Sequence, residues 1–383
     1  MKLRILAVFF AFYFPLNIFA QKENSKSIKA LWVVRDILKS KTDIEKMLND
    51  AEAARITDLF VQVRGRGDAY YKSALVPLAE GLDGSFDPLE FVLLKSDGRF
   101  KIHVWINVMY IWSADNNPAS KEHLLFKHPE WSAVSKSGTS MIDEGLKKLK
   151  ERNKEGYYLS PGNNEFQEYF LRVVDELVHR YKIDGVHMDY IRYAGKEYDY
   201  SVTMRSKFIL NYNIDPFTTD SNGRVGVQQA EQKKWFEKLW STFRRDELTA
   251  FIKRIRNTVN SIRANITLSA AVWADMDLAT NEMFQDWPAW IKNGYIDFAV
   301  PMNYAADNNL FESRVKSAKD KVGDKIMAQN IIMGISMYNQ NSAAMNEKVA
   351  ICKVYGLKGI SFFSYESVRK DRAYYQRMAE AGY

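Results

Sequence analysis

Several signatures of common enzyme classes are missing from this chain of 383 residues. It has no GxSxG elbow of serine hydrolases, no P-loop and no GxGxxG dinucleotide fingerprint. It also lacks HxH and HExxH metal-binding pairs, and it contains only five histidines. Cys352 is the only cysteine, so no intramolecular disulfide can form. These absences disfavour serine-triad and nucleotide-dependent chemistry, and we expect no cofactor.

Long apolar runs are scarce as well. The N-terminus starts with Lys2 and Arg4, continues with a short apolar core and ends in small residues, which predicts a cleavable signal peptide over residues 1–20. That core is too short to span a bilayer, and no later stretch is long and apolar enough. We expect an exported protein, periplasmic or extracellular in a bacterium, whose residues 21–383 form a single domain.

The charge balance and the aromatic content narrow the range of partners. The net charge is +7, but the lysines and arginines form no dense basic arm. Together with export, this argues against a nucleic-acid partner. The chain has 9 Trp, 21 Tyr and 22 Phe, and aromatic side chains exposed in a cleft stack on sugar rings. We therefore expect an oligosaccharide or polysaccharide substrate.

Apolar strand-like runs alternate with helical patterns along the chain, which indicates parallel βα units. Eight such units in a chain of this size predict a (β/α)8 TIM barrel. Long insertions are expected after the third and fourth strands, over residues 110–159 and 194–246, where they would roof a substrate groove. The predicted strands are Ala30–Val34, Leu59–Arg64, His103–Asn107, Val186–Asp189, Thr267–Trp273, Phe298–Asn303, Ile332–Met337 and Gly359–Tyr365.

Helix signals fill the segments between these strands. Thr42 and Glu45 have the spacing of a capping box, and Asn164 with Gln167 predicts the start of a second helix. A third helix is predicted over residues 248–262 from apolar residues at helical spacing.

The run from Asp184 to Tyr193 is the most informative in the sequence. Side chains alternate faces along a strand, so His187 and Asp189 share one face while Val186 and Met188 share the other. This pattern predicts a strand that delivers a carboxylate into a cavity.

Polar and aromatic residues also end most of the other predicted strands, or directly follow them. A barrel interior is normally filled by branched apolar side chains. A polar layer over many strand ends is costly unless it is solvated or used, so we predict an active site there. The candidate substrate-binding residues are Arg64, Asp68, Tyr71, His103, Trp105, Asn107, His187, Arg192, Tyr193, Trp273, Asn303, Tyr304 and Tyr338.

Carboxyl groups at this rim suit the hydrolysis of a glycosidic bond, which usually needs two of them. Asp189 is the first candidate for the nucleophile, or for the base of an inverting enzyme. Asp275 is the first candidate for the acid, with Asp277 and Glu366 as rivals. We expect a neighbouring arginine, Arg64 or Arg192, to keep Asp189 ionised.

Three other interpretations stay open at this point. In the first, Asp189 and Arg192 form a structural pair that holds a loop. In the second, the barrel binds carbohydrate without catalysis, through the aromatic residues Trp105, Trp273, Tyr304 and Tyr338. In the third, His103, His187 and Asp189 on adjacent strands gather around a zinc ion, as in barrel metallohydrolases.

The chain resembles the glycosyl-hydrolase-like family 10, whose members are exported bacterial TIM barrels. The resemblance runs from about Lys29 to the C-terminus and implies glycoside hydrolysis of cell-envelope glycans, including peptidoglycan strands stripped of their peptides. It implies a catalytic role for Asp189. The segments that carry it are 31–33, 60–71, 103–107, 128–131, 158–162, 184–193, 214–216, 240–245, 285–287, 301–304 and 362–365.

Two positions depart from the pattern of this family. Many members carry a second Asp directly after the first, and Tyr190 occupies that position here. Many end the sixth strand in Gln-x-Tyr-Trp, whereas this chain has Met302-Asn303-Tyr304. Both differences indicate a subgroup that acts on a different sugar.

Overall fold

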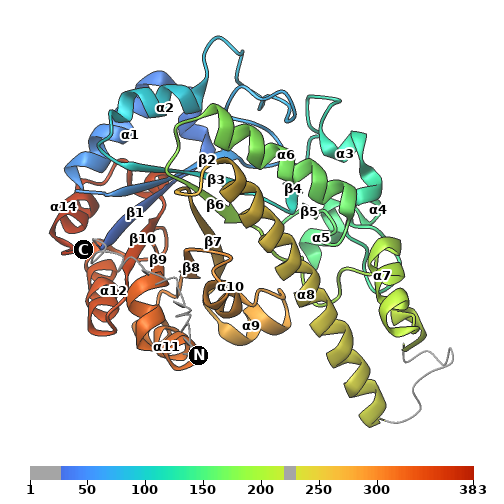
Figure 1. Ribbon diagram of the computed structural model, residues 1–383. Helices are drawn as coiled ribbons and strands as arrows, with labels where there is room; N and C mark the ends of the chain where they lie inside the picture. Colours follow the sequence, from blue (N-terminus) through green and yellow to red (C-terminus); the bar gives the residue numbers. More distant parts are fainter. Residues whose placement is uncertain (1–26, 220–229) are drawn as a thin grey trace, which may run out of the picture.

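Eight parallel strands close into a barrel in the computed structural model, which describes residues 27–219 and 230–383 (Figure 1). Around the ring the order is β1, β2, β3, β6, β7, β8, β9 and β10, and β10 pairs with β1. The predicted TIM barrel is therefore confirmed, while the expected signal peptide, residues 1–20, lies outside the described residues. The strands are β1 Ile28–Val33, β2 Asp58–Arg64, β3 Lys101–Asn107, β6 Gly185–Asp189, β7 Thr267–Trp273, β8 Phe298–Asn303, β9 Ile332–Ser336 and β10 Gly359–Phe363.

Helices cover the outside of the barrel, and their apolar stripes bury the outer faces of the strands. The principal helices are α1 Lys41–Ala53, α2 Pro88–Ser96, α6 Asn164–Arg180, α8 Ala230–Ile262, α9 Met276–Asn281, α10 Trp287–Lys292, α11 Asn308–Asn330, α12 Ser342–Val354, α13 Tyr365–Val368 and α14 Arg372–Glu380. The connection from β1 to α1 contains the 3-10 helix η1, Arg35–Lys39.

Two long segments follow β3 and β6, where the long insertions were expected. The first holds the two-stranded antiparallel sheet of β4 (Tyr110–Trp112) and β5 (Tyr157–Tyr158), with the short elements α3 Leu124–Lys127, η2 Pro129–Trp131, α4 Met141–Glu144 and α5 Leu146–Glu151. The second holds α7 (Val202–Tyr212), η3 (Pro216–Thr219) and the first part of α8, which extends beyond the barrel in Figure 1. Phe208 of α7 packs on Trp240 of α8, with 4.9 Å between the ring centroids.

The predicted helix starts are each displaced. Ser40 caps α1 in place of Thr42, because its hydroxyl accepts a hydrogen bond from the Asp43 N–H. Asn163 caps α6, because its side chain accepts from the Phe166 N–H. Helix α8 begins at Ala230, well before the predicted residue 248, since its first turns pack on α7 rather than on the barrel.

Aromatic side chains fill the middle of the barrel. Trp32, Phe60, Trp105 and Phe298 belong to one buried cluster inside the ring of strands. Because these rings occupy the barrel interior, the open space lies above them, at the C-terminal ends of the strands.

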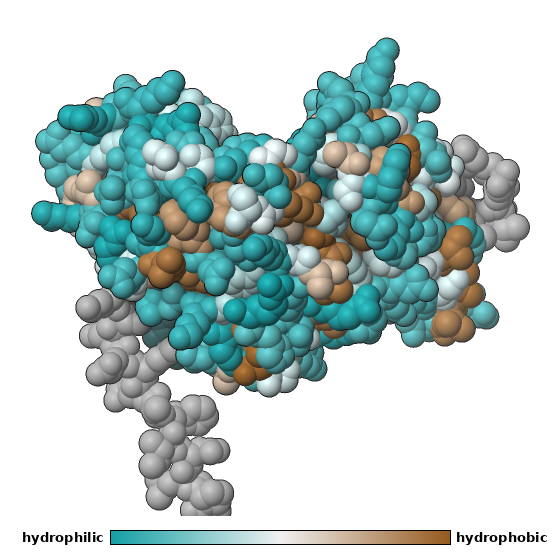
Figure 2. All heavy atoms as spheres, turned by 90° about the horizontal axis from the view of Figure 1, so that it is seen from above, coloured by the Kyte–Doolittle hydropathy of each residue, from teal (hydrophilic) through white to brown (hydrophobic). Residues whose placement is uncertain are grey.

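The face in Figure 2 is mostly hydrophilic, with apolar side chains in separate patches. Within residues 27–219 and 230–383, none of the helices has the length and apolar character needed to cross a membrane.

Candidate active site

A cavity of about 500 Å³ opens at the C-terminal ends of the barrel strands. Parallel strands bring their last residues to one end of a barrel, which is where barrel active sites are built. Seven of the predicted site residues line it: Trp105, Asn107, Asp189, Arg192, Trp273, Asp275 and Tyr304. The other lining residues are Trp32, Val34, Arg35, Gln62, Tyr110, Glu155, Tyr190, Ala271, Ala274, Met302, Arg314 and Phe363.

Asp189 ends β6 and is only 7% exposed. Its Oδ2 accepts a hydrogen bond from the Trp105 indole N–H at 3.1 Å, and its Oδ1 accepts from the Tyr190 backbone N–H at 2.7 Å. Tyr190 itself has a φ of 51°, in the left-handed region that non-glycine residues rarely adopt. The chain therefore turns sharply after Asp189, and both residues line the cavity.

Burial raises the pKa of Asp189 to about 6, although the Arg192 guanidinium and the two hydrogen bonds act in the opposite direction. We expected an arginine to keep this carboxyl fully ionised. Arg192 does act in that direction, but the loss of hydration at this site is the larger effect. Asp189 can therefore both hold and release a proton close to neutral pH.

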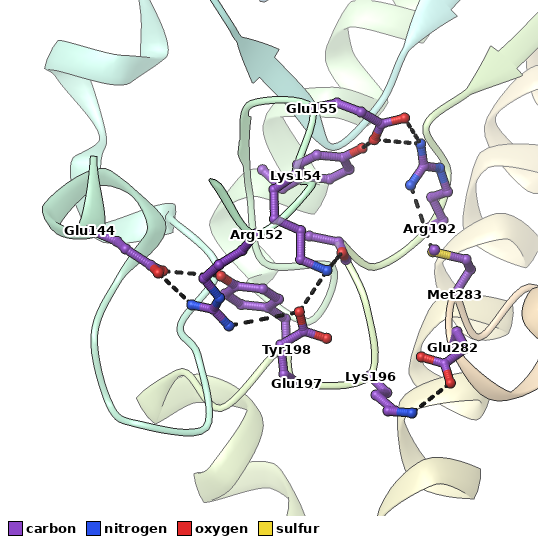
Figure 3. A network of polar contacts seen from close by, with 12 residues as sticks. Glu144, Arg152, Lys154, Glu155, Arg192, Lys196, Glu197, Tyr198, Glu282 and Met283 are labelled. Atoms are coloured by element: carbon purple, nitrogen blue, oxygen red, sulfur yellow. Dashed lines mark hydrogen bonds and ion pairs between the residues drawn. The ribbon is translucent and has the colours of Figure 1, made fainter. Parts of the chain in front are cut away.

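Arg192 is directed toward a second carboxylate, Glu155, which lies just before β5. Its Nη2 donates to both Glu155 oxygens, at 3.0 and 2.9 Å (Figure 3). The Tyr158 hydroxyl also donates to Glu155. Burial raises the pKa of Glu155, but Arg192 and the hydrogen bonds lower it more, so the net shift is downward. Glu155 thus stays ionised, and its side chain remains 47% exposed.

Glu155 was missed by the sequence analysis. It lies in an irregular stretch of the long segment after β3, where neither strand alternation nor helical spacing applies. The only signal was the nearby aromatic pair, Tyr157 and Tyr158, which marks a short β-strand.

The three candidates for the acid, Asp275, Asp277 and Glu366, occupy different environments, and Asp277 is exposed outside the cavity lining. Asp275 lines the cavity, and its Oδ1 caps α9 by accepting from the backbone N–H groups of Asp277 and Leu278, each at 3.1 Å. Glu366 lies outside the cavity lining and accepts from the Val34 backbone N–H at 3.3 Å. Burial raises the pKa of Glu366 to about 7.

Aromatic rings form much of the cavity wall. Tyr304 stacks on Phe363 with 5.1 Å between the ring centroids, and Tyr338 meets the edges of both rings. Tyr338 is 57% exposed and lies outside the lining, next to its mouth. Trp273 lines the cavity from the end of β7, the neighbour of β8, and its indole N–H has no hydrogen-bond partner within the described residues.

The two predicted histidines lie deeper in the barrel, outside the cavity lining. His187 accepts from the Trp32 indole N–H at 3.1 Å and donates to the Ser269 hydroxyl at 2.9 Å. Burial lowers the pKa of His187, so the ring is neutral. His103 pairs through Nε2 with Asp58 at 2.9 Å.

The zinc arrangement is not formed, because both ring nitrogens of His187 are engaged and His103 is directed toward Asp58. Within the described ranges, no three His, Cys, Asp or Glu side chains are grouped so that they could hold a metal ion.

Arg64 does not reach the cavity, contrary to our expectation. The register between β2 and β3 shifts between Gln62 and Arg64, a β-bulge that turns the next side chain to the other face. Gln62 consequently lines the cavity, while Arg64 donates to the Asn107 carbonyl and lies over the Phe170 ring of α6.

The other predicted binding residues, Asp68, Tyr71, Tyr193 and Asn303, are buried in structural contacts outside the lining. Asp68 accepts from the Arg66 N–H at 2.8 Å, and Tyr71 packs edge-on against Tyr181. Tyr193 donates to the Arg244 carbonyl at 3.1 Å, and Asn303 donates to the Phe311 carbonyl at 2.9 Å.

The sequence profile of the family described as "Glycosyl hydrolase-like 10" matches residues 26–351. Among curated proteins, the chain is 24% identical over 332 residues to glycosyl hydrolase YngK of Bacillus subtilis, covering 76% of this chain and 57% of the relative. It is 24% identical over 278 residues to glycosyl hydrolase DigH of Escherichia coli, covering 67% and 56%. The chain thus spans little more than half the length of these relatives.

Solved structures with the same architecture include glycosidases. The PgaB glycoside hydrolase domain from Bordetella bronchiseptica superposes with a TM-score of 0.68 at 12% identity, covering 93% of this chain and 99% of that one. A β-galactosidase from Bacillus circulans gives 0.66 at 13% identity, covering 93% and 55%. At these identities the likeness shows the fold, and the family assignment depends on the profile match. The chain belongs to the glycosyl hydrolase-like 10 family.

Proposed function

We propose that this protein is an exported glycoside hydrolase that cleaves O-glycosidic bonds of a polysaccharide in the rim cavity, the space lined by Asp189 and its neighbours. The observation that carries the proposal is the Asp189 carboxyl itself. It is buried at the end of β6, its pKa is about 6, and aromatic side chains suited to sugar rings line the same cavity. A carboxyl that titrates near neutral pH suits general acid–base catalysis.

Two carboxyl groups with separated pKa values suggest a division of roles. Asp189 has a raised pKa and suits the donor of a proton to the leaving oxygen, whereas Glu155 has a lowered pKa and stays ionised. Asp189 is thus proposed as the general acid, in place of the nucleophile or base expected from the sequence. Asp275 is the alternative ionised partner, since it also lines the cavity.

The proposed substrate is a cell-envelope glycan, such as peptidoglycan strands without their peptides. Family membership and the names of the curated relatives support hydrolysis of a glycan. The predicted signal peptide supports export to the periplasm or the cell surface, where such glycans occur.

The test is Asp189→Asn, assayed by new reducing ends on a panel of envelope and plant glycans. We expect the rate to fall by about 10²- to 10⁴-fold, the usual contribution of one acid–base group. Asp277→Asn is the matched control, because Asp277 is an exposed carboxylate on α9 outside the cavity lining. Glu155→Gln and Asp275→Asn are assayed in the same way. The variant with the larger loss of rate identifies the second catalytic carboxyl.

Unchanged turnover by a folded Asp189→Asn protein would contradict the proposal. Glycan binding by the unaltered protein without any new reducing ends would show a carbohydrate-binding barrel instead.

A further inference from the structure

The rim cavity contains a positively charged side chain, Arg314, that pairs with no carboxylate in the described part of the chain. It comes from the first part of α11, the helix after β8, and it lines the cavity. Its Nε is buried without a hydrogen-bond partner. Across residues 27–219 and 230–383, no ion pair or hydrogen bond to this side chain is formed. A buried donor without a partner is costly, and in a native protein it calls for an explanation such as a bound ligand, ion or water.

Arg35 repeats this situation on another wall of the cavity. It follows β1, and its Nη1 donates at 3.0 Å to the neutral side chain of Gln62. Its Nε is likewise buried without a partner, and no carboxylate in the described part of the chain pairs with it. Its stem passes 2.4 Å from the place where a Cβ on residue 65 would lie, so glycine at position 65 leaves room for Arg35.

Arg192, the third arginine that lines the cavity, shows that an arginine can form an ion pair with a carboxylate of the protein here. Arg192 is held by both oxygens of Glu155, so its charge is balanced by the protein although its Nε also lacks a hydrogen-bond partner within the described residues. Arg314 and Arg35 have no such balance, and neutral sugar hydroxyls cannot supply it. A guanidinium presents a planar fork of donors that matches a carboxylate in two parallel hydrogen bonds.

The positions of the two arginines suit a chain of sugars rather than a single one. In ring order, β7 and β8 lie on one side of β6, and β3, β2 and β1 lie on the other. Arg314 and Arg35 are therefore on opposite sides of the strand that carries Asp189. A glycan that runs through the cavity past Asp189 would place different sugars beside the two guanidinium groups.

We infer that Arg314 and Arg35 are specificity-determining residues that select a glycan whose sugars carry carboxylate groups. This inference builds on the proposed function, because it names the substrate class of the same cavity. Arg314 supports the inference more strongly than Arg35, because the Arg35 guanidinium makes one hydrogen bond within the protein.

The experiment compares each glycan with its carboxyl-reduced form, which differs only in that charge. The probes are oligogalacturonate, oligoglucuronate and peptide-free peptidoglycan strands, each before and after reduction, with dextran sulfate and dextran as a sulfate pair. Binding is measured by calorimetry on the Asp189→Asn protein, and kcat and KM are measured on the protein with Asp189. We expect at least one carboxylated probe to bind about 10- to 100-fold more tightly than its reduced form, the usual worth of hydrogen bonds to a charged group.

Arg314→Gln should bring this ratio close to one, mainly through KM. Lys316→Gln is the matched control, because Lys316 is an exposed cation two residues away on the same helix, outside the cavity lining. The control should keep the ratio.

Equal binding of the reduced and carboxylated forms would overturn the inference, as would a ratio that survives Arg314→Gln or a preference for the sulfate pair alone. A carboxylate preference in binding without turnover by the unaltered protein would leave the inference standing and contradict the hydrolase proposal. Turnover of the carboxylated and the reduced glycan at equal rates would support the hydrolase proposal and contradict the inference.

Discussion

Two polar regions of the barrel interior differ in how their groups are satisfied. In the deeper one, the histidine layer of His103 and His187, His187 uses both ring nitrogens. His103 pairs with Asp58 through Nε2, and only its Nδ1 lacks a partner in the described part of the chain. In the rim cavity above it, Arg314, Arg35 and Trp273 keep donors without partners in the described part of the chain. Residues of similar polarity therefore have different roles. The first group makes its hydrogen bonds within the protein except at His103 Nδ1, whereas the charged arginines of the second group have no carboxylate partner among the described residues and are available to a ligand.

The largest effect on stability is expected in the histidine layer. His187→Ala removes a ring that stacks on Phe60 at 4.2 Å and leaves the Trp32 indole and the Ser269 hydroxyl without their partner. We expect the free energy of unfolding to fall by about 3–5 kcal/mol, as for other large buried rings. Urea denaturation measures this change.

His179→Ala is the matched control, since His179 on α6 has a side chain 59% exposed, and its effect should stay within about 0.5 kcal/mol. A His187→Ala protein of unchanged stability that had lost its activity would place His187 in the chemistry and end the distinction between the two regions.

A smaller effect of opposite sign is expected at Asp189. Its pKa of about 6 in the folded protein lies above the ordinary value of 3.8, so the folded state holds the proton more tightly and loses stability as the pH rises from about 4 through 6. Asp189→Asn removes this penalty. We expect a gain of about 1–3 kcal/mol at pH 8, because one pKa unit corresponds to about 1.4 kcal/mol and the amide makes poorer hydrogen bonds.

Thermal or urea unfolding of the two proteins at pH 4 and pH 8 tests this expectation. The gain should shrink toward zero at pH 4. A gain independent of pH would show that burial of the charge is not its cause.

The smallest effect is expected from the hydrogen bond between Trp105 and Asp189. The indole N–H stabilises the ionised carboxyl, so Trp105→Phe should raise the pKa of Asp189 further, by up to about 1 unit. The corresponding limb of the pH profile of kcat/KM should move to higher pH. Trp273→Phe is the comparison, because its indole makes no hydrogen bond to Asp189, and the limb should stay in place. Equal movement in both variants would assign the shift to general changes in the cavity wall.

The architecture followed from the sequence because strand periodicity repeats eight times. The alternation rule also placed His187 and Asp189 on the inner face of the same strand, as the structure does. The alternation rule did not show that His187 lies deeper in the barrel than Asp189. Alternation says which face of the sheet a side chain occupies, but not how far it lies from the cavity. It failed at Arg64, where a β-bulge breaks the period after Gln62.

The partners of Asp189 were harder to predict. Glu155 reaches the cavity from an irregular segment that no periodicity governs, and its pairing with Arg192 joins residues 37 positions apart. Arg314 lies on α11 among other charged residues, and its sequence position gives no sign that it lacks a counterpart. Burial and pairing of this kind depend on the packed structure.

A crystal structure of the Asp189→Asn protein with a bound oligosaccharide tests the central claim most directly. We predict that the glycan lies in the rim cavity against Trp105, Trp273 and Tyr304, with a glycosidic oxygen beside residue 189. An oligosaccharide bound elsewhere on the protein, with the cavity unoccupied by sugar, would contradict the account.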